Sequence, residues 1–236
     1  MSLVLVHSPK GGVGSTTIAA NLALALALDG HDVAALDLTG QDVLGLHLGN
    51  RPDVAATANL RSDDQVVVIS GVHFLSTGAR RAEDTMVDRL LQRARVSDAV
   101  IVVDLAGGDH ATLDRLMPEA KLHLCVVSPD PGCIALLPRM LDGLDATPTR
   151  FVINKADDRI RLRRDAAAFL RTTLQDGVIG VVRRDEAVPE SLALIEPLSS
   201  HAPASAALAD MNTLAGAVAV LLDRPARPEA KLQGAA

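Results

Sequence analysis

The sequence predicts an α/β fold in which a mostly parallel, twisted sheet is flanked by helices. Short aliphatic runs alternate with longer helical stretches, which is the pattern of β–α–β units. The length of 236 residues suits one domain of this class. The chain holds only three Phe and neither Trp nor Tyr, so the core is expected to be aliphatic. We therefore expect one domain over residues 1–223, followed by a flexible tail at 224–236 that lacks apolar periodicity.

The first half of the chain begins with a predicted strand, a glycine-rich turn and a buried helix. Residues 3–7 are apolar, residues 9–17 hold the glycines, and an Ala- and Leu-rich helix runs on to Asp29, before Gly30. Strands are predicted at 33–38 and, as one or two strands around Gly71, at 66–76. An amphipathic helix follows at 83–95. The run at 99–105 is the most strand-like in the chain and stops at a Gly pair.

The second half repeats this alternation. Strands are predicted at 122–127, 151–154 and 178–182. Helices are predicted from the Asp-Pro-Gly turn at 130–132 to about residue 144, at 159–175 and at 204–222. Ser199, Ser200 and His201 are expected in a loop and not in a catalytic triad. Because no internal repeat or linker divides the chain, the elements are expected to form one sheet.

Composition excludes several classes of function. The net charge is −6, so the chain lacks the overall basic character that duplex DNA binding favours. Without aromatic platforms, direct binding of a glucan or of single-stranded nucleic acid is not expected. Five arginines (Arg159, Arg161, Arg163, Arg164 and Arg171) fall in one predicted helix, as a solvated face or a local basic patch. With two cysteines, no secretion signal and no apolar run of membrane-spanning length, a cytoplasmic protein is expected.

The chemical signal is the segment His-Ser-Pro-Lys-Gly-Gly-Val-Gly-Ser-Thr-Thr at 7–17, between a strand and a helix. Glycines there let backbone N–H groups turn inward, and the helix start adds its positive dipole end, so the segment can cradle phosphates. Thr16 stands where a P-loop supplies a Mg²⁺ ligand, and Asp104 stands where a second carboxylate holds that ion through water. The P-loop pattern itself fails twice, because Pro9 replaces Gly and Ser15 replaces Lys.

The segment Lys-Gly-Gly-Val-Gly-x-Thr-Thr, followed by Ala-Ala-Asn-Leu-Ala, resembles the deviant Walker A motif of the ParA/MinD ATPases. The resemblance runs from Leu3 to about Leu222. It includes the strand that ends at Asp37, the Walker B-like strand that ends at Asp104, and the strand that ends at Asn154. It also includes Val-Arg-Arg-Asp-Glu-Ala-Val-Pro-Glu at 182–190 and the Ala-Pro-x-Ser-x-Ala segment at 202–207.

This resemblance implies a MinD-like P-loop NTPase of the SIMIBI class that holds ATP or ADP with Mg²⁺, and an ATP-bound homodimer. By resemblance, Lys10 reaches across the dimer to the partner's nucleotide and is the one candidate catalytic residue. Thr16 and Asp104 (through water) are the implied metal residues, and Asp37 is implied to support them without contacting the ion. The implied nucleotide-binding residues are Lys10, Gly11, Gly12, Val13, Gly14, Ser15, Thr16, Thr17, Asn154 for the adenine, Arg183 and Pro203.

Two departures from the family pattern affect the expected chemistry. The usual loop lysine, which neutralises phosphate charge, is Ser15, and the usual water-orienting aspartate is Thr39. Phosphoryl transfer depends on positioning and electrostatics, so losing either group slows it by orders of magnitude. We therefore expect a protein that binds ATP and dimerises around it, and that is at most a weak ATPase.

Three segments are similar to the YhjQ/BcsQ group, which is encoded with bacterial cellulose synthase: the loop itself, Gly-Gln-Asp-Val-Leu-Gly-Leu-His-Leu-Gly at 40–49, and Arg-Arg-Asp-Glu-Ala-Val at 183–188. This similarity implies a nucleotide-dependent accessory or scaffold protein that works with the cellulose synthase complex and its cytosolic accessory subunits. It would reach the inner membrane only through those partners. The alternatives are a ParA-like ATPase that positions DNA or pili, a MinD-like membrane-cycling protein, and a degenerate scaffold that binds no nucleotide.

Overall fold

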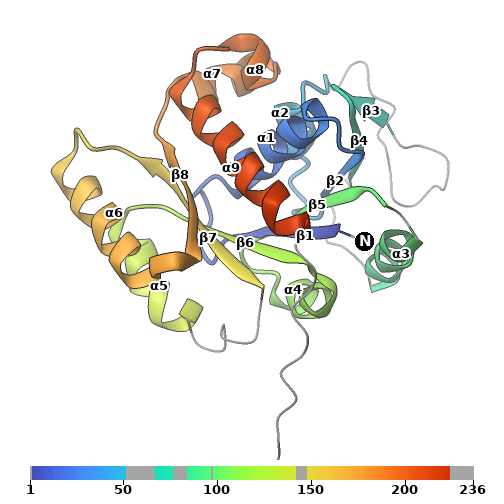
Figure 1. Ribbon diagram of the computed structural model, residues 1–236, viewed down its shortest axis with the longest axis horizontal. Coiled ribbons are helices and arrows are strands. Elements are labelled where there is room, and N and C mark those ends of the chain that lie inside the picture. The colour runs from blue at the N-terminus through green and yellow to red at the C-terminus, as the bar shows by residue number, and fades with distance from the viewer. Residues whose placement is uncertain (1, 52–66, 77–83, 97, 142–147, 224–236) are drawn as a thin grey trace, which may run out of the picture.

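The computed structural model describes residues 2–51, 67–76, 84–96, 98–141 and 148–223. Within these ranges the strands form one eight-stranded sheet of order β3-β4-β2-β5-β1-β6-β7-β8 (Figure 1). Neighbouring strands are parallel except β3 and β4, which form an antiparallel hairpin. The strands are β1 (Ser2–His7), β2 (Val33–Asp37), β3 (Val67–Ile69), β4 (Val72–Ser76), β5 (Val100–Asp104), β6 (Leu122–Val127), β7 (Thr149–Ala156) and β8 (Val178–Arg183).

Helices connect the strands and cover the sheet. The long helices α1 and α9 lie side by side, and α9 also packs along β8 (Figure 1). The helix α6 packs against β7 and contacts α5. The described helices are α1 (Ser15–Leu28), α2 (Leu44–His47), α3 (Asp84–Val96), α4 (His110–Leu116), α5 (Pro131–Leu141), α6 (Arg161–Leu174), α7 (Ala187–Leu194), α8 (Leu198–His201) and α9 (Ala206–Asp223).

The core is aliphatic, as the composition predicts. Strands β5 and β6 are buried at every position, which is typical of parallel strands covered on both faces. Alternate residues of β1 belong to two different clusters: Val4 and Val6 pack with α1 and α9, whereas Leu3 and Leu5 pack with α3 and α4. Of the three Phe, only Phe169 is exposed.

Helix α9 is the one described helix that is long and apolar enough to cross a membrane, judged by length and composition alone. It lies against α1 and β8, and its residues Met211, Leu214 and Val218 are buried in the larger apolar cluster. These contacts are those of a core helix.

Several predicted elements differ in detail. The expectation that Ser199, Ser200 and His201 lie in a loop is wrong, because they belong to α8. The short helices α2, α4 and α7 were not predicted, since four to eight residues are too few to show a helical apolar repeat. Helix α6 begins two residues later than Arg159. The tail at 224–236 and the predicted helix end at 142–144 lie outside the described residues.

The parallel arrangement gathers the polar strand ends. Strands β1, β2, β5 and β7 run in the same direction, so His7, Asp37, Asp104 and Asn154 approach the same edge of the sheet. In open α/β sheets ligands bind at this carboxyl edge. The fold therefore places the predicted functional residues where a site is expected.

Candidate functional site

The segment between β1 and α1 forms a loop that wraps a polar cavity. Gly12 (φ 79°) and Gly14 (φ 93°) adopt left-handed conformations that L side chains rarely adopt. Helix α1 begins at Ser15, and no side chain caps its first turn. The N–H groups of that turn are therefore open to an anion. A cavity of about 230 Å³ lies here, lined by Ser8, Lys10, Gly11, Gly12, Gly14, Ser15, Thr16, Thr39, Gln41, Leu105, Ala106 and Gly107.

Two carboxylates lie beneath this cavity. Asp37 and Asp104 are opposite each other in the β2–β5 ladder, and both are fully buried. Neither carboxylate oxygen of Asp104 has a hydrogen-bond partner of good geometry among the described residues. Burial raises the pKa of the Asp104 carboxyl well above its usual range, the nearby Thr16 hydroxyl opposes this rise, and the charge of Asp37 adds to it.

This arrangement fits a bound Mg²⁺. An orphaned buried carboxylate is costly, and a hard divalent cation with oxygen ligands would satisfy it. No cluster of three or more His, Cys, Asp or Glu side chains in the described ranges could hold a metal by itself. Mg²⁺ would therefore depend on Thr16, on Asp104 and on the oxygens of a bound phosphate, as it does in other P-loop proteins.

Thr39 lies at the side of the cavity and hydrogen-bonds Asp37. Its backbone N and its Oγ1 donate to Asp37 Oδ1 at 2.9 and 2.6 Å, and the backbone N of Leu44 donates to Asp37 Oδ2 at 3.0 Å. Asp37 thus organises the loop that follows β2. A threonine hydroxyl at this position carries no negative charge, so it lacks the basic oxygen that a carboxylate would offer to water.

Lys10 forms an ion pair with Asp130, at the start of α5. Its Nζ lies 2.6 Å from Asp130 Oδ1, and the two side chains are 38% and 27% exposed. Burial alone would raise the pKa of the Asp130 carboxyl, but hydrogen bonds from Lys10, Ser128 and the backbone N of Cys133 lower it to about 2. Lys10 therefore folds back within its own chain, and it must leave Asp130 before it can reach another molecule.

A second cavity of about 360 Å³ lies beside the loop on the β7–β8 side. Of the predicted residues, Thr17, Asn154 and Arg183 line this cavity, whereas Pro203 is exposed and lines neither cavity. Val13, within the loop, is buried. The lining residues of the second cavity are Thr17, His47, Asn154, Lys155, Arg163, Val182, Arg183, Arg184, Asp185, Glu186, Val188, Pro189, Leu192 and Met211.

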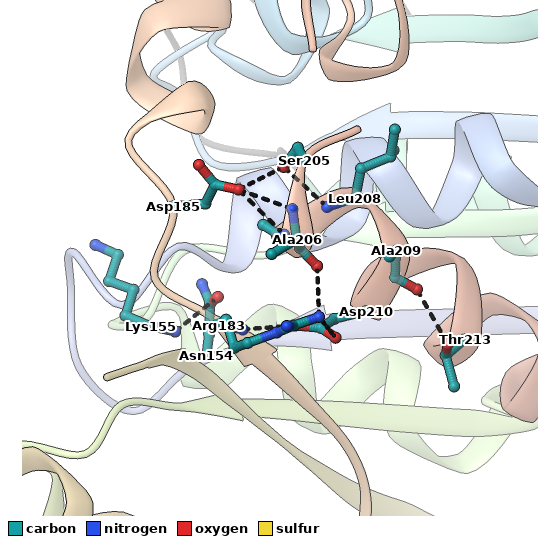
Figure 2. Close-up of polar contacts among 11 residues, drawn as sticks. Asn154, Lys155, Arg183, Asp185, Ser205, Ala206, Leu208, Ala209, Asp210 and Thr213 are labelled. Atoms are coloured by element: carbon teal, nitrogen blue, oxygen red, sulfur yellow. Dashed lines mark hydrogen bonds and ion pairs between the residues drawn. The ribbon is translucent and has the colours of Figure 1, made fainter. Parts of the chain in front are cut away.

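The wall formed by β8 and α9 is held by polar contacts, which Figure 2 shows. The Arg183 guanidinium forms two hydrogen bonds of 2.8 Å with Asp210, one to each carboxylate oxygen. Asp185 Oδ2 accepts from Ser205 Oγ at 2.8 Å and from the backbone N of Ala206 at 2.9 Å, at the start of α9. These hydrogen bonds hold β8 and the start of α9 together beside the cavity. They also mean that the Arg183 guanidinium is already paired.

The end of β7 contacts the loop directly. Asn154 is buried, and its Nδ2 donates to the Val13 carbonyl at 2.8 Å. The Lys155 Nζ donates to the Gly12 carbonyl at 2.7 Å. The sequence reasoning missed both Lys155 and Asp130. The Asn-Lys pair at the end of an apolar strand, and the Asp-Pro-Gly start of a helix, are the signals that could have found them.

Three buried histidines lie close to the site: His7, His47 and His123. His47 Nε2 lies 3.3 Å from Thr17 Oγ1, and His123 Nδ1 lies 2.9 Å from Thr149 Oγ1. Burial lowers the pKa of His7 and His47 to about 4 and that of His123 to about 3. All three imidazoles are therefore neutral near pH 7.

Comparison with known proteins agrees with this geometry. Residues 1–218 match the family described as "Cellulose biosynthesis protein BcsQ". A septum site-determining protein MinD of Guillardia theta is 26% identical over 216 residues, spanning 83% of this chain and 80% of that protein. An uncharacterised ATP-binding protein of Methanocaldococcus jannaschii is 26% identical over 225 residues, spanning 86% of this chain and 82% of that protein.

Solved structures of low sequence identity share the fold. MinD in the MinC:MinD complex of Aquifex aeolicus superposes with a TM-score of 0.75 at 21% identity, covering 93% of this chain and 96% of that one. MinD of Pyrococcus horikoshii, solved with Mg-ADP, gives a TM-score of 0.72 at 19% identity, covering 91% and 94%. These structures confirm the predicted MinD-like P-loop architecture.

Proposed function

The chain belongs to the BcsQ family of cellulose biosynthesis proteins, within the MinD/ParA-type P-loop ATPases, and on that premise we propose that it is a nucleotide-dependent accessory protein of bacterial cellulose secretion. Binding of ATP would switch it between a monomer and a dimer with ATP at the interface. The observation that carries the proposal is the orphaned Asp104 carboxylate close to Thr16, in the uncapped first turn of α1 that follows the glycine loop. That combination suits a Mg²⁺-bound phosphate chain.

The loop would hold the phosphates by backbone amides and by the Ser15 and Thr16 hydroxyls. Thr16 and, through water, Asp104 would hold the Mg²⁺, which when bound would neutralise phosphate charge. The 360 Å³ cavity beside Asn154 has the size and position to take the adenine and ribose. Pro189 is the proline that lines it, so it is the better candidate than Pro203 for contact with the base.

Lys10 would complete the site of a second protomer. In one chain its ammonium is neutralised by Asp130, and the triphosphate of a partner offers more negative charge than one carboxylate. Dimerisation would thus exchange an internal ion pair for a contact between protomers. The same exchange would change the surface around α5, which gives a physical route from nucleotide state to partner binding.

Hydrolysis would be slow. Ser15 supplies no cation to the phosphates. At position 39 a threonine, whose hydroxyl donates to Asp37, stands where a carboxylate would orient the attacking water. The protein would act as a long-lived ATP-bound scaffold in the cytoplasm, reaching the inner membrane through the synthase complex. Turnover of ATP at about one per second or faster, the range of ordinary enzymes, contradicts this part of the proposal.

The cellular role is tested by complementation in the source bacterium. Deletion of the gene should abolish cellulose deposition measured by dye binding, and the wild-type gene should restore it. Asp104→Asn and Lys10→Ala should fail to restore it at equal protein level, whereas Arg171→Ala, an exposed change on α6, should succeed. Normal cellulose in the deletion strain contradicts the proposed role. Full rescue by both site variants contradicts the nucleotide switch.

A further inference from the structure

Within the phosphate loop of this chain, no lysine is in position to contact the phosphates of a nucleotide bound to the same chain. Ser15 stands at the usual lysine position, and Lys10 is engaged by Asp130 at 2.6 Å. If the amides of the loop are to face an anion, its carbonyl groups must be held pointing outward. Hydrogen bonds from the end of β7 hold two of these carbonyls.

Two consecutive residues of β7 bind two consecutive carbonyls of the loop. Asn154 Nδ2 donates to Val13 O at 2.8 Å, and Lys155 Nζ donates to Gly12 O at 2.7 Å. In a peptide group the C=O and the next N–H point in opposite directions. A donor on the Gly12 carbonyl therefore orients the Val13 N–H, and a donor on the Val13 carbonyl orients the Gly14 N–H. Both amides are thereby turned away from the end of β7.

The backbone conformation at Lys155 is unusual and directs its side chain toward the loop. Lys155 has φ 59°, a left-handed conformation that costs a non-glycine residue about 1 kcal/mol or more. The ladder between β7 and β8 is irregular between Ile153 and Ala156, and such a bulge re-aims side chains. Figure 2 shows the Lys155 side chain extending away from Arg183 and Asp210.

The charged groups around Lys155 are mostly cationic. Burial lowers the pKa of its ammonium, Arg184, Arg163 and Lys10 lower it further, and the Asp130 carboxylate raises it. Arg184 is paired with Glu186, and no ion pair of Lys155 is found in the described part of the chain. An ammonium on a carbonyl oxygen polarises the whole peptide and makes its N–H a stronger donor.

We infer that Lys155 is the positioning cation of the phosphate loop: it supplies through the Gly12 carbonyl, from outside the loop, the positive charge that Ser15 does not supply from within. The inference rests on the proposed nucleotide binding and goes beyond it, since it assigns to this residue the orientation of the Val13 and Gly14 amides. Lys155 touches the loop and not the reacting atoms, so its role is positional.

The test is the affinity for Mg-ADP, measured by calorimetry on the full-length protein. Lys155→Met keeps the stem and removes the charge, and it should weaken binding roughly 10- to 100-fold, the worth of a charge-assisted hydrogen bond. Lys155→Arg should retain most of the affinity. The control Arg171→Met removes an exposed cation from α6, outside both cavities, and it should change affinity less than about threefold.

A second change separates charge from packing. In the Lys155→Met background, Ser15→Lys returns a lysine to the loop and should recover at least about tenfold of the lost affinity, which a packing role would not predict. Equal melting temperatures would show that the variants fold. If the wild-type protein binds no nucleotide, the proposed function is wrong. If it binds and Lys155→Met binds within about twofold of it, or Ser15→Lys restores nothing, the role assigned to Lys155 is wrong.

Discussion

Replacing Asp130 by Asn should release Lys10 and strengthen the ATP-bound dimer. The ion pair between Lys10 Nζ and Asp130 Oδ1 is 2.6 Å long and partly screened, since the side chains are 38% and 27% exposed. A pair of this kind is worth about 1 kcal/mol. Two copies must break when a symmetric dimer forms, so removing them should favour dimerisation by about 2 kcal/mol, or roughly 30-fold in dissociation constant.

The assay is the dimer dissociation constant in Mg-ATP, measured by sedimentation equilibrium. Asn has the shape of Asp and can still accept from the Cys133 backbone N, which Asp130 Oδ1 accepts at 3.1 Å. Asp109→Asn is the matched control, because Asp109 caps α4 in the same way, accepting from the Thr112 N at 3.1 Å. An ATP-bound dimer that Asp130→Asn leaves unchanged or weakens would show that the Lys10–Asp130 pair does not oppose dimerisation.

The remaining predictions concern stability and ligand class. The three buried histidines have folded pKa values below the unfolded value of about 6.5, so the unfolded state binds more protons. The free energy of unfolding should therefore fall as pH drops from about 6.5 towards 4, by about 2 kcal/mol per histidine at pH 5. His123→Gln should reduce the proton uptake on urea unfolding at pH 5 by about one; an unchanged uptake would count against the buried neutral imidazole. Gly14→Ala should abolish nucleotide binding and lower the melting temperature, because φ is 93° and the added Cβ would lie 2.5 Å from Asn154 Nδ2. In the control Gly108→Ala the added Cβ meets nothing within 4 Å, so this change should be neutral. Equal melting temperatures of the two variants would contradict this prediction. Duplex DNA at low salt should show no gel shift with about 10 μM protein, and a shift that salt abolishes would instead favour a DNA-positioning role.

The sequence was sufficient for the sheet and for the phosphate loop. Parallel strands buried on both faces leave long aliphatic runs, so β5 and β6 stand out, and the glycines of the loop are required by φ values of 79° and 93°. The short helices were not recognisable because tertiary packing, and not an apolar repeat, holds them. Helix α4 is the exception, since Asp109 three residues before Thr112 is an N-cap pattern that the sequence does contain.

The contacts between distant segments could not be predicted. The Lys10–Asp130 pair spans 120 positions and the Lys155–Gly12 contact spans 143. Each depends on side-chain geometry at the sheet edge that no local pattern encodes. Arg183 lines the larger cavity while its guanidinium is paired with Asp210. Pro203 lines neither cavity, and the nucleotide-binding roles of both residues stay predictions. The roles of the remaining loop residues stay predictions.

The most direct test of the account is to incubate the purified chain with Mg-ATP, separate it by size exclusion, and measure the ATP and ADP carried in each peak. We expect a dimer peak that holds about one nucleotide per protomer, still mostly ATP after several minutes, and a monomer peak for Lys10→Ala. A wild-type monomer without nucleotide, or a dimer that holds only ADP after a few seconds, would contradict the proposed long-lived ATP-bound scaffold.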